Sequence, residues 1–343
     1  MNPAIITASL DANVPLILWG EPGTGKTAFI RSFYADHHME VLIGSTMDPC
    51  DVTGMPLPDV DKTRVRWAPP EWAIRVRDAL DDGKRAILFL DELSCAPSSV
   101  QAALLRVVHE RRIGDIVIPE CRIIAASNPP ETAADNGFFS AAMSSRFAHM
   151  QWSVDTNAWI RGELGGWGKT RSLSHAKYAA QICDFIHRNP ATLSPERETM
   201  TMNTNDPWPC PRSWSAAITM IACTANREDH QQLLVSCVGT AAANECIVYL
   251  NNLDLPDPDE LLSGAAALPK RNDQIFASLG SLVAVALLPH VNRLARVKTA
   301  WGILAKVRPD IALTAARVLV DECPEVTPDE ASALGARITK LGI

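Results

Sequence analysis

The stretch that decides the fold is "LILWGEPGTGKTAFIRSF", residues 16–33. An apolar run precedes a glycine-rich loop, and a segment of helical periodicity follows the Lys-Thr pair that closes the loop. Residues 20–27 fit the pattern G-x-x-x-x-G-K-[ST], in the strand, loop and helix order that this pattern requires. The stretch therefore predicts a phosphate-binding loop in an α/β fold with a parallel sheet.

The residue types in this loop suit a nucleoside triphosphate. Glycines let the chain turn so that backbone N–H groups converge on phosphate oxygens at the positive end of the following helix. We expect Lys26 to neutralise β- and γ-phosphate charge and Thr27 to offer its hydroxyl to Mg²⁺. A glycine-rich turn that binds nothing is the alternative. The predicted ATP-binding residues are Gly20, Glu21, Pro22, Gly23, Thr24, Gly25, Lys26 and Thr27.

Two further apolar runs end in polar residues. "RAILFLDELS" carries Asp91 and Glu92 at its end, and "CRIIAASNPP" leads to Asn128. The carboxyl ends of parallel strands share one edge of a sheet, so these side chains are expected beside the phosphate loop. Asp91 is suited to holding Mg²⁺, Glu92 to orienting and deprotonating a water, and Asn128 to fixing the γ-phosphate or that water. Two acids at this position indicate hydrolysis rather than binding alone.

The pattern of the chain changes near residue 155. Before it, short aliphatic runs alternate with helical stretches, which is typical of a parallel sheet covered on both faces. After it, helical periodicity dominates, interrupted by polar segments that contain proline. We therefore predict an α/β core at 1–154, an all-helical region at 155–255 and a further helical segment at 256–343.

Composition narrows the function classes. The 343 residues carry a formal net charge of −7, which gives no electrostatic reason to expect bulk nucleic-acid binding. Nine cysteines form no C-x-x-C pair, so neither a zinc site nor a disulfide framework is indicated. The first residues lack the features of a signal peptide, and the longest apolar stretch, 275–291, is short for a bilayer span. We expect a cytoplasmic protein.

Four segments in this order resemble the AAA+ ATPases, most closely the MoxR-type branch: "GEPGTGKT", "LFLDELSCAPSSVQAALLRVVHERRIG", "RIIAASNPPE" and "SSRF". The resemblance spans roughly residues 13–147 and continues more weakly through "CPRSW". It implies that residues 20–27 are Walker A, Asp91 and Glu92 Walker B, and Asn128 sensor 1. It further implies that Arg146 is an arginine finger for a neighbour's nucleotide, and that Arg212 is sensor 2 on a helical lid at 155–255.

The segment "STMDPCDVTGMPLPDVDKTRVRWAPPEW" resembles the helix-2 insert of this branch, which contains a hairpin and commonly faces the pore or a partner. One departure concerns the stretch before the finger. MoxR-type proteins usually have G-x-x-x-L-P-E-A there, whereas this chain has "GFFSAAMSSRF". Arg111 and Arg112 remain alternatives to Arg146 for the finger.

These expectations combine into one function. No residue of one subunit clearly supplies the last cation for phosphoryl transfer, which favours a ring in which each subunit completes the next. The resemblance implies a homo-oligomeric, hexameric, Mg²⁺- and ATP-dependent chaperone that remodels a client, with a partner that carries a von Willebrand factor A (VWA) domain. A nucleotide-gated switch or scaffold with slow hydrolysis is the second possibility. A nucleic-acid-dependent motor is the third.

Overall fold

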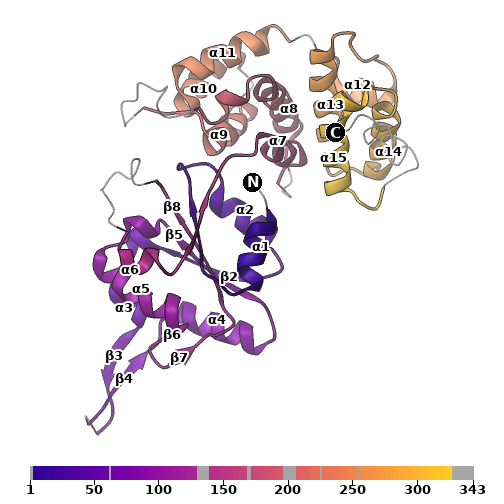
Figure 1. Cartoon of the computed structure of the whole chain (residues 1–343). Helices are drawn as coiled ribbons and strands as arrows, with labels where there is room; N and C mark the ends of the chain where they lie inside the picture. Colours follow the sequence, from indigo (N-terminus) through magenta and orange to yellow (C-terminus); the bar gives the residue numbers. More distant parts are fainter. Residues whose placement is uncertain are drawn as a thin grey trace. The chain divides into compact units, whose positions relative to one another are not determined.

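The computed structural model describes residues 3–61, 63–129, 139–167, 171–195, 206–224, 226–253 and 255–326. The chain forms two compact units, residues 1–153 and 154–343. Figure 1 labels most of the helices and strands.

The first unit is built on a five-stranded sheet in which all pairings are parallel. The strand order is β2-β5-β8-β1-β9. The α/β fold class with a parallel sheet is thereby confirmed, whereas β9 had not been predicted. The strands are β1 (Leu16–Trp19), β2 (His38–Ile43), β5 (Ala86–Asp91), β8 (Arg122–Ser127) and β9 (Ala148–Gln151).

Helices cover both faces of this sheet because alternate strand residues are apolar on both sides. On one face of the sheet, the side chains of Leu16, Leu18, Ile87 and Phe89 pack against two helices. On the other face, the residues that alternate with them, such as Ile17 and Leu88, pack against three helices. The first face is covered by α1 (Pro3–Asp11) and α2 (Lys26–Phe33), and the second by α3 (Pro49–Thr53), α4 (Glu71–Asp81) and α5 (Ser98–Glu110) (Figure 1). The short α6 (Ala141–Ser144) precedes β9.

Two antiparallel hairpins interrupt the α/β order. The longer pairs β3 (Met55–Pro58) with β4 (Val65–Ala68) and projects from the first unit (Figure 1). It lies in the segment that resembles a helix-2 insert. The shorter pairs β6 (Arg112–Ile113) with β7 (Ile116–Val117).

The second unit contains helices and no strand in its described residues. Most of the apolar stretch at 275–291 lies in α13, which ends at Ala286. No helix of the described residues is long and apolar enough to cross a membrane. One apolar cluster includes residues of both α8 and α15, so the division into 155–255 and 256–343 stays a prediction. The helices are α7 (Thr156–Gly165), α8 (Leu173–Arg188), α9 (Pro211–Ala222), α10 (His230–Val238), α11 (Thr240–Asn251), α12 (Pro258–Ser263), α13 (Asn272–Ala286), α14 (Arg293–Leu304) and α15 (Pro309–Glu322).

Candidate functional site

Three adjacent strands end at one place in the first unit. The order β5-β8-β1 brings the residues after these strands to the same edge of the sheet. The loop after β1 and Asn128 after β8 are linked directly, since the Lys26 Nζ donates to Asn128 Oδ1 at 3.3 Å. The candidate site is therefore formed by segments that are far apart in the sequence.

The phosphate loop joins β1 to α2 through two glycines with positive φ. Gly23 has φ of 77° and Gly25 of 88°, a region that L-residues seldom adopt. Lys26 is the first residue of α2 and is only 8% exposed. Its ammonium donates to the backbone carbonyls of Gly20 at 2.5 Å and Glu21 at 3.1 Å. A fixed cation thus lies inside the loop, where it suits phosphate oxygens.

Thr27 and Asp91 together form a suitable place for a magnesium ion. The Thr27 hydroxyl donates to Asp91 Oδ2 at 2.8 Å, so one hydroxyl and one carboxylate oxygen lie side by side. Mg²⁺ prefers such oxygen ligands, keeps several waters and takes the rest of its shell from substrate phosphates. When bound with ATP, it would neutralise the charge that develops on the transferred phosphoryl group. Thr27 and Asp91 are the residues that would hold it.

Glu92 follows β5 in a left-handed conformation, with φ of 52°. Its backbone N–H donates to Asp91 Oδ1 at 3.1 Å. Its carboxylate Oε2 accepts a hydrogen bond from the Ser45 hydroxyl at 2.5 Å. Ser45 lies in the 3-10 turn that follows β2, on the side of β5 opposite to β8 and the phosphate loop. The carboxylate predicted as the base is therefore bound by a residue from the β2 side of β5.

Arg146 is not among the residues brought together at this edge. It lies in the turn before β9, which runs parallel to β1 with Ala148 opposite Leu16. Leu16 is four residues before Gly20, so about 13 Å of strand separates Arg146's end of the sheet from the phosphate loop. Arg146 donates to the Ala142 carbonyl at 2.5 Å, and its buried Nε has no partner among the described residues.

Arg111 is held within its own subunit. Only 8% exposed, it donates to the carbonyls of Cys121 and Val108, and its Nη2 donates to Asn13 Oδ1 at 3.2 Å. Burial lowers the pKa of this guanidinium. The donors of Arg111 are thus used by backbone carbonyls of its own subunit, which disfavours it as an arginine finger. Arg146 and the exposed Arg112 are the better candidates for that role.

Arg212 belongs to the second unit, in the first turn of α9, and its side chain is exposed. The capping box of Cys210 and Ser213 fixes the start of this helix. Its role as sensor 2 stays a prediction.

Ser45 and Trp152 are site residues that the sequence did not reveal. Ser45 ends the aliphatic run "MEVLIGS" at 39–45. The strand in this run, β2, pairs with β5, which leads to Glu92, so the position of Ser45 was a usable signal. Trp152 follows β9, and its indole N–H donates to the Thr24 carbonyl in the phosphate loop at 3.2 Å. The sequence contained no signal for this contact of Trp152, because β9 itself was not predicted.

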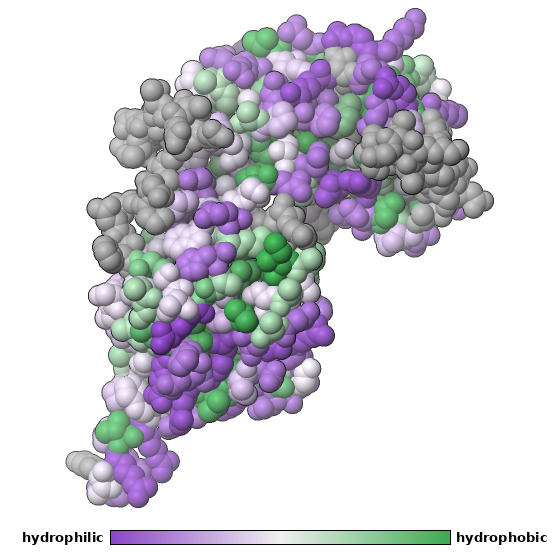
Figure 2. Space-filling model, in the orientation of Figure 1, coloured by the Kyte–Doolittle hydropathy of each residue, from purple (hydrophilic) through white to green (hydrophobic). Residues whose placement is uncertain are grey.

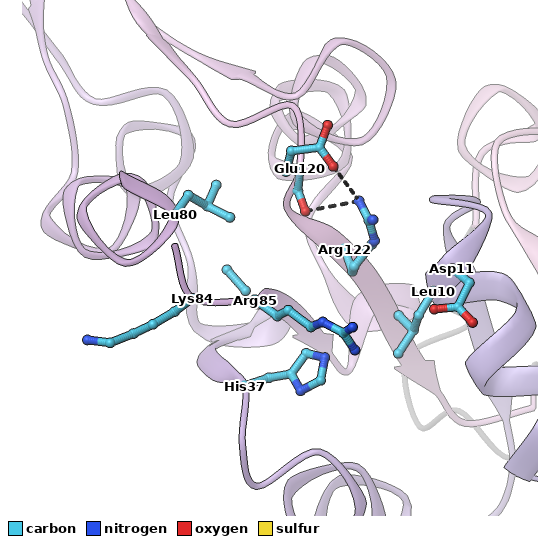
Figure 3. Close-up of a pocket in the computed structure, with 9 residues that line it drawn as sticks. Leu10, Asp11, His37, Leu80, Lys84, Arg85, Glu120 and Arg122 are labelled. Carbon is cyan, nitrogen blue, oxygen red and sulfur yellow. Dashed lines mark hydrogen bonds and ion pairs between the residues drawn. The ribbon is translucent and has the colours of Figure 1, made fainter. Parts of the chain in front are cut away.

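A separate pocket of about 190 Å³ lies at the opposite edge of the sheet (Figure 3). Arg85 precedes β5 there, and Arg122 begins β8. The carboxylates of Asp11 and Glu120 also line it, and Glu120 pairs with Arg122 at 3.3 Å. Lys84 and His37 line it as well, so the pocket carries charge of both signs and is separate from the nucleotide site.

Comparison with known proteins bears on the first unit. Residues 15–147 match the family model of the AAA domain, dynein-related subfamily. No curated protein matches the chain. A proline-to-glycine mutant of Thermotoga maritima RuvB is 14% identical, with 84% of this chain and 88% of that chain covered and a TM-score of 0.38. A proposed ATPase from Cytophaga hutchinsonii is 13% identical, with 91% and 79% covered and a TM-score of 0.34.

The sheet order, the phosphate loop and the family match agree. Residues 15–147 have the AAA+ P-loop fold, and the protein is an ATPase. The structural similarities have low TM-scores and add no detail to this assignment.

Proposed function

We propose that the protein is a MoxR-type AAA+ chaperone that forms a homo-oligomeric, hexameric ring and uses Mg²⁺-dependent ATP hydrolysis to remodel a protein client. In this proposal Lys26 and Asn128 bind the phosphates. Asp91 and Thr27 hold Mg²⁺, and Glu92 orients and deprotonates the attacking water. Arg212 senses the nucleotide from the helical unit.

The observation that carries the proposal is the place of Arg146 in the sheet. It precedes the amino end of β9, whereas the phosphate loop follows the carboxyl end of β1. An arginine there cannot reach the γ-phosphate of its own subunit, but it is available to a neighbour's site. It also lines an open hollow of about 560 Å³ together with His109 and Ser145. A ring, in which each Arg146 meets the next subunit's nucleotide, uses both features.

A client or partner role is supported by the hairpin β3–β4. Its exposed large apolar residues include Val60, which is fully exposed, and Val65 at 61%. Figure 2 shows apolar and polar surface together at this projecting end of the first unit. Several large apolar side chains exposed on one projecting element favour an interaction site for another protein. We propose that this hairpin contacts the client or a VWA-domain partner.

The proposed location is the cytoplasm. All nine cysteines are free in the structure. Free thiols of this kind persist in a reducing compartment.

A nucleotide-gated switch with slow hydrolysis is a second candidate, favoured by the hydrogen bond between Ser45 and Glu92. A base that is held away from the phosphates turns over slowly until it is released. The two candidates differ in the steady-state rate with and without a partner. A large stimulation by a partner supports the chaperone, and a slow rate under every condition supports the switch.

The test of the ring uses two variants that fail for different reasons. Arg146→Ala is expected to bind ATP nearly as the wild type does and to hydrolyse it roughly 10³-fold more slowly. Lys26→Ala lacks the phosphate cation instead. Mixing the two variants should restore part of the activity, since some interfaces then combine an intact loop with an intact finger.

In the control, Arg146→Ala is mixed with the double variant Lys26→Ala/Arg146→Ala instead of with Lys26→Ala. Neither protein then supplies an arginine finger, so no ATPase activity should be restored. Arg112→Ala tests the remaining alternative for the finger. It should hydrolyse ATP at the normal rate, and a loss of hydrolysis in this variant but not in Arg146→Ala would assign the finger to Arg112. A stable monomer at saturating ATP, measured by light scattering, with full Arg146-dependent hydrolysis contradicts the trans role.

A further inference from the structure

The indole of Trp152 lies against the outer side of the phosphate loop. Its N–H donates to the carbonyl of Thr24 at 3.2 Å. Its backbone N–H donates to the Trp19 carbonyl at 2.6 Å, which continues the pairing of β9 with β1 up to the loop. One residue therefore contacts the last residue of the strand and the middle of the loop.

Packing holds the indole ring of Trp152 in place, in addition to the hydrogen bond of its N–H. A Cβ at Gly20 would come within 2.8 Å of the Trp152 Cβ, so the first loop glycine leaves the space that this residue fills. The Phe29 ring from α2 stands against the indole with a centroid distance of 5.2 Å and an interplanar angle of 69°. Trp152 thus has little freedom to turn its N–H elsewhere.

The hydrogen bond sets the orientation of one loop peptide. Thr24 is 8% exposed, and its own hydroxyl donates to the Glu21 carbonyl at 2.6 Å. In a planar trans peptide, the carbonyl of one residue and the N–H of the next point in opposite directions. A Thr24 carbonyl held toward Trp152 therefore turns the Gly25 N–H to the other side. That N–H donates to no described residue.

The peptide between Thr24 and Gly25 is free to flip if nothing holds it. Gly25 has no side chain, and a Cβ placed there would meet nothing within 4 Å. Glycine with φ of 88° has alternative conformations at small cost. A loop that must first select one orientation binds an anion more weakly than one that already has it.

We propose that Trp152 is a positioning residue for the nucleotide: its indole N–H holds the Thr24–Gly25 peptide so that the Gly25 N–H points at the phosphates. This rests on the proposed nucleotide site. Trp152 touches neither the nucleotide nor the reacting atoms in this account. It acts through the loop and is the contact by which β9 adjusts phosphate affinity.

The test is Trp152→Phe, which keeps an aromatic ring beside Gly20 and Phe29 and removes the donor together with one ring of the indole. The dissociation constant and the KM for Mg·ATP should rise about fivefold, the effect of one hydrogen bond. The kcat should stay within about twofold, because bound phosphates orient the peptide themselves. Trp72→Phe is the matched control, since it makes the same change of ring and donor and its indole N–H donates to the Asp51 carbonyl rather than to the loop. It should leave ATP affinity unchanged.

Two outcomes overturn the inference. One is wild-type ATP affinity in a folded Trp152→Phe, and the other is a loss of kcat and melting temperature with unchanged affinity. Lys26→Ala is measured in parallel. If it too keeps wild-type affinity, the nucleotide site is misassigned and the inference falls with it. If Lys26→Ala loses binding and Trp152→Phe does not, only the role of Trp152 is wrong.

Wild-type protein supplies a measurement that does not depend on the variant folding. If the indole hydrogen bond favours ATP binding, ATP must favour the hydrogen bond to the same extent. Hydrogen exchange of the Trp152 indole N–H, followed by NMR, should slow about fivefold when Mg·ATP is added. An exchange rate that does not change with nucleotide contradicts the proposal.

Discussion

Replacement of Ser45 by alanine is expected to raise the resting rate of ATP hydrolysis. The Ser45 hydroxyl holds the Glu92 carboxylate at 2.5 Å, on the β2 side of β5. The phosphate loop and Asn128 lie on the other side, after β1 and β8. For Glu92 to deprotonate a water near the γ-phosphate, its side chain has to leave Ser45. Ser45→Ala removes the interaction that has to be broken.

The size of the effect follows from this one hydrogen bond. Hydrogen bonds to charged groups contribute about 1.5–3 kcal/mol, but both residues are exposed, so a value near 1 kcal/mol is appropriate. If breaking this bond is part of the barrier, its removal lowers the barrier by that amount. Each 1.36 kcal/mol is tenfold in rate, so the expected increase is about fivefold. ATP affinity should change little, because Ser45 does not contact the loop.

The assay is steady-state phosphate release at saturating Mg·ATP. Thr46→Ala is the matched control, since its hydroxyl donates to the Ile43 carbonyl at 3.1 Å in the same turn and does not bind Glu92. It should hydrolyse ATP at the wild-type rate. The double variant Ser45→Ala/Glu92→Gln should be as inactive as Glu92→Gln alone. A rate for Ser45→Ala that equals or falls below the wild type refutes the reasoning.

Three further outcomes are expected. Lys26→Ala should lose tight Mg·ATP binding in calorimetry, because the phosphates lose a buried counter-cation; unchanged affinity would exclude the Walker A assignment. Arg111→Ala should destabilise the first unit by about 2–4 kcal/mol in urea unfolding, since buried carbonyls lose their donors; a folded variant of normal stability but lost activity would instead favour a finger role. Burial raises the pKa of Cys121 to about 12, so this thiol should react with a thiol reagent at pH 7.5 only when the protein unfolds. The exposed Cys50 and Cys223 should be labelled in the folded protein, and mass spectrometry of the labelled peptides identifies which cysteines have reacted.

The site was predictable where chemistry is carried by consecutive residues. Residues 20–27 combine a turn, a cation and a hydroxyl in one stretch, and Asp91 ends a run of five buried strand residues. Such runs show which residues end a strand, and a parallel sheet then brings those ends together. The hydrogen bonds from Lys26 to Asn128 and from Thr27 to Asp91 agree with that reasoning.

β9 could not be recognised in the same way. It has four residues, "AHMQ", pairs only with β1 at the edge of the sheet, and leaves most of its side chains exposed. It therefore shows neither the apolar run of a central strand nor a clear alternation. Without β9, the sequence could show neither the contact of Trp152 with the phosphate loop nor the position of Arg146 relative to β1. The hydrogen bond of Ser45 was missed for a related reason, because it crosses from β2 to β5.

The same strand sets two separate properties of the proposed catalytic cycle. At its amino end, β9 holds Arg146 in a turn that is about 13 Å of strand away from its own phosphate loop. At its carboxyl end, it delivers Trp152 to the Thr24 carbonyl. The indole of Trp19 donates to His149 Nδ1 and so connects β1 with β9 between these two points. His149 Nε2 lies 2.9 Å from the carbonyl of Ser144, beside the turn that holds Arg146. Because β9 pairs with β1 over its whole length, we expect a shift of the loop to be transmitted along β9 to the turn that holds Arg146. In the proposed ring, this connection would let nucleotide binding in one subunit adjust the arginine that is offered to the next.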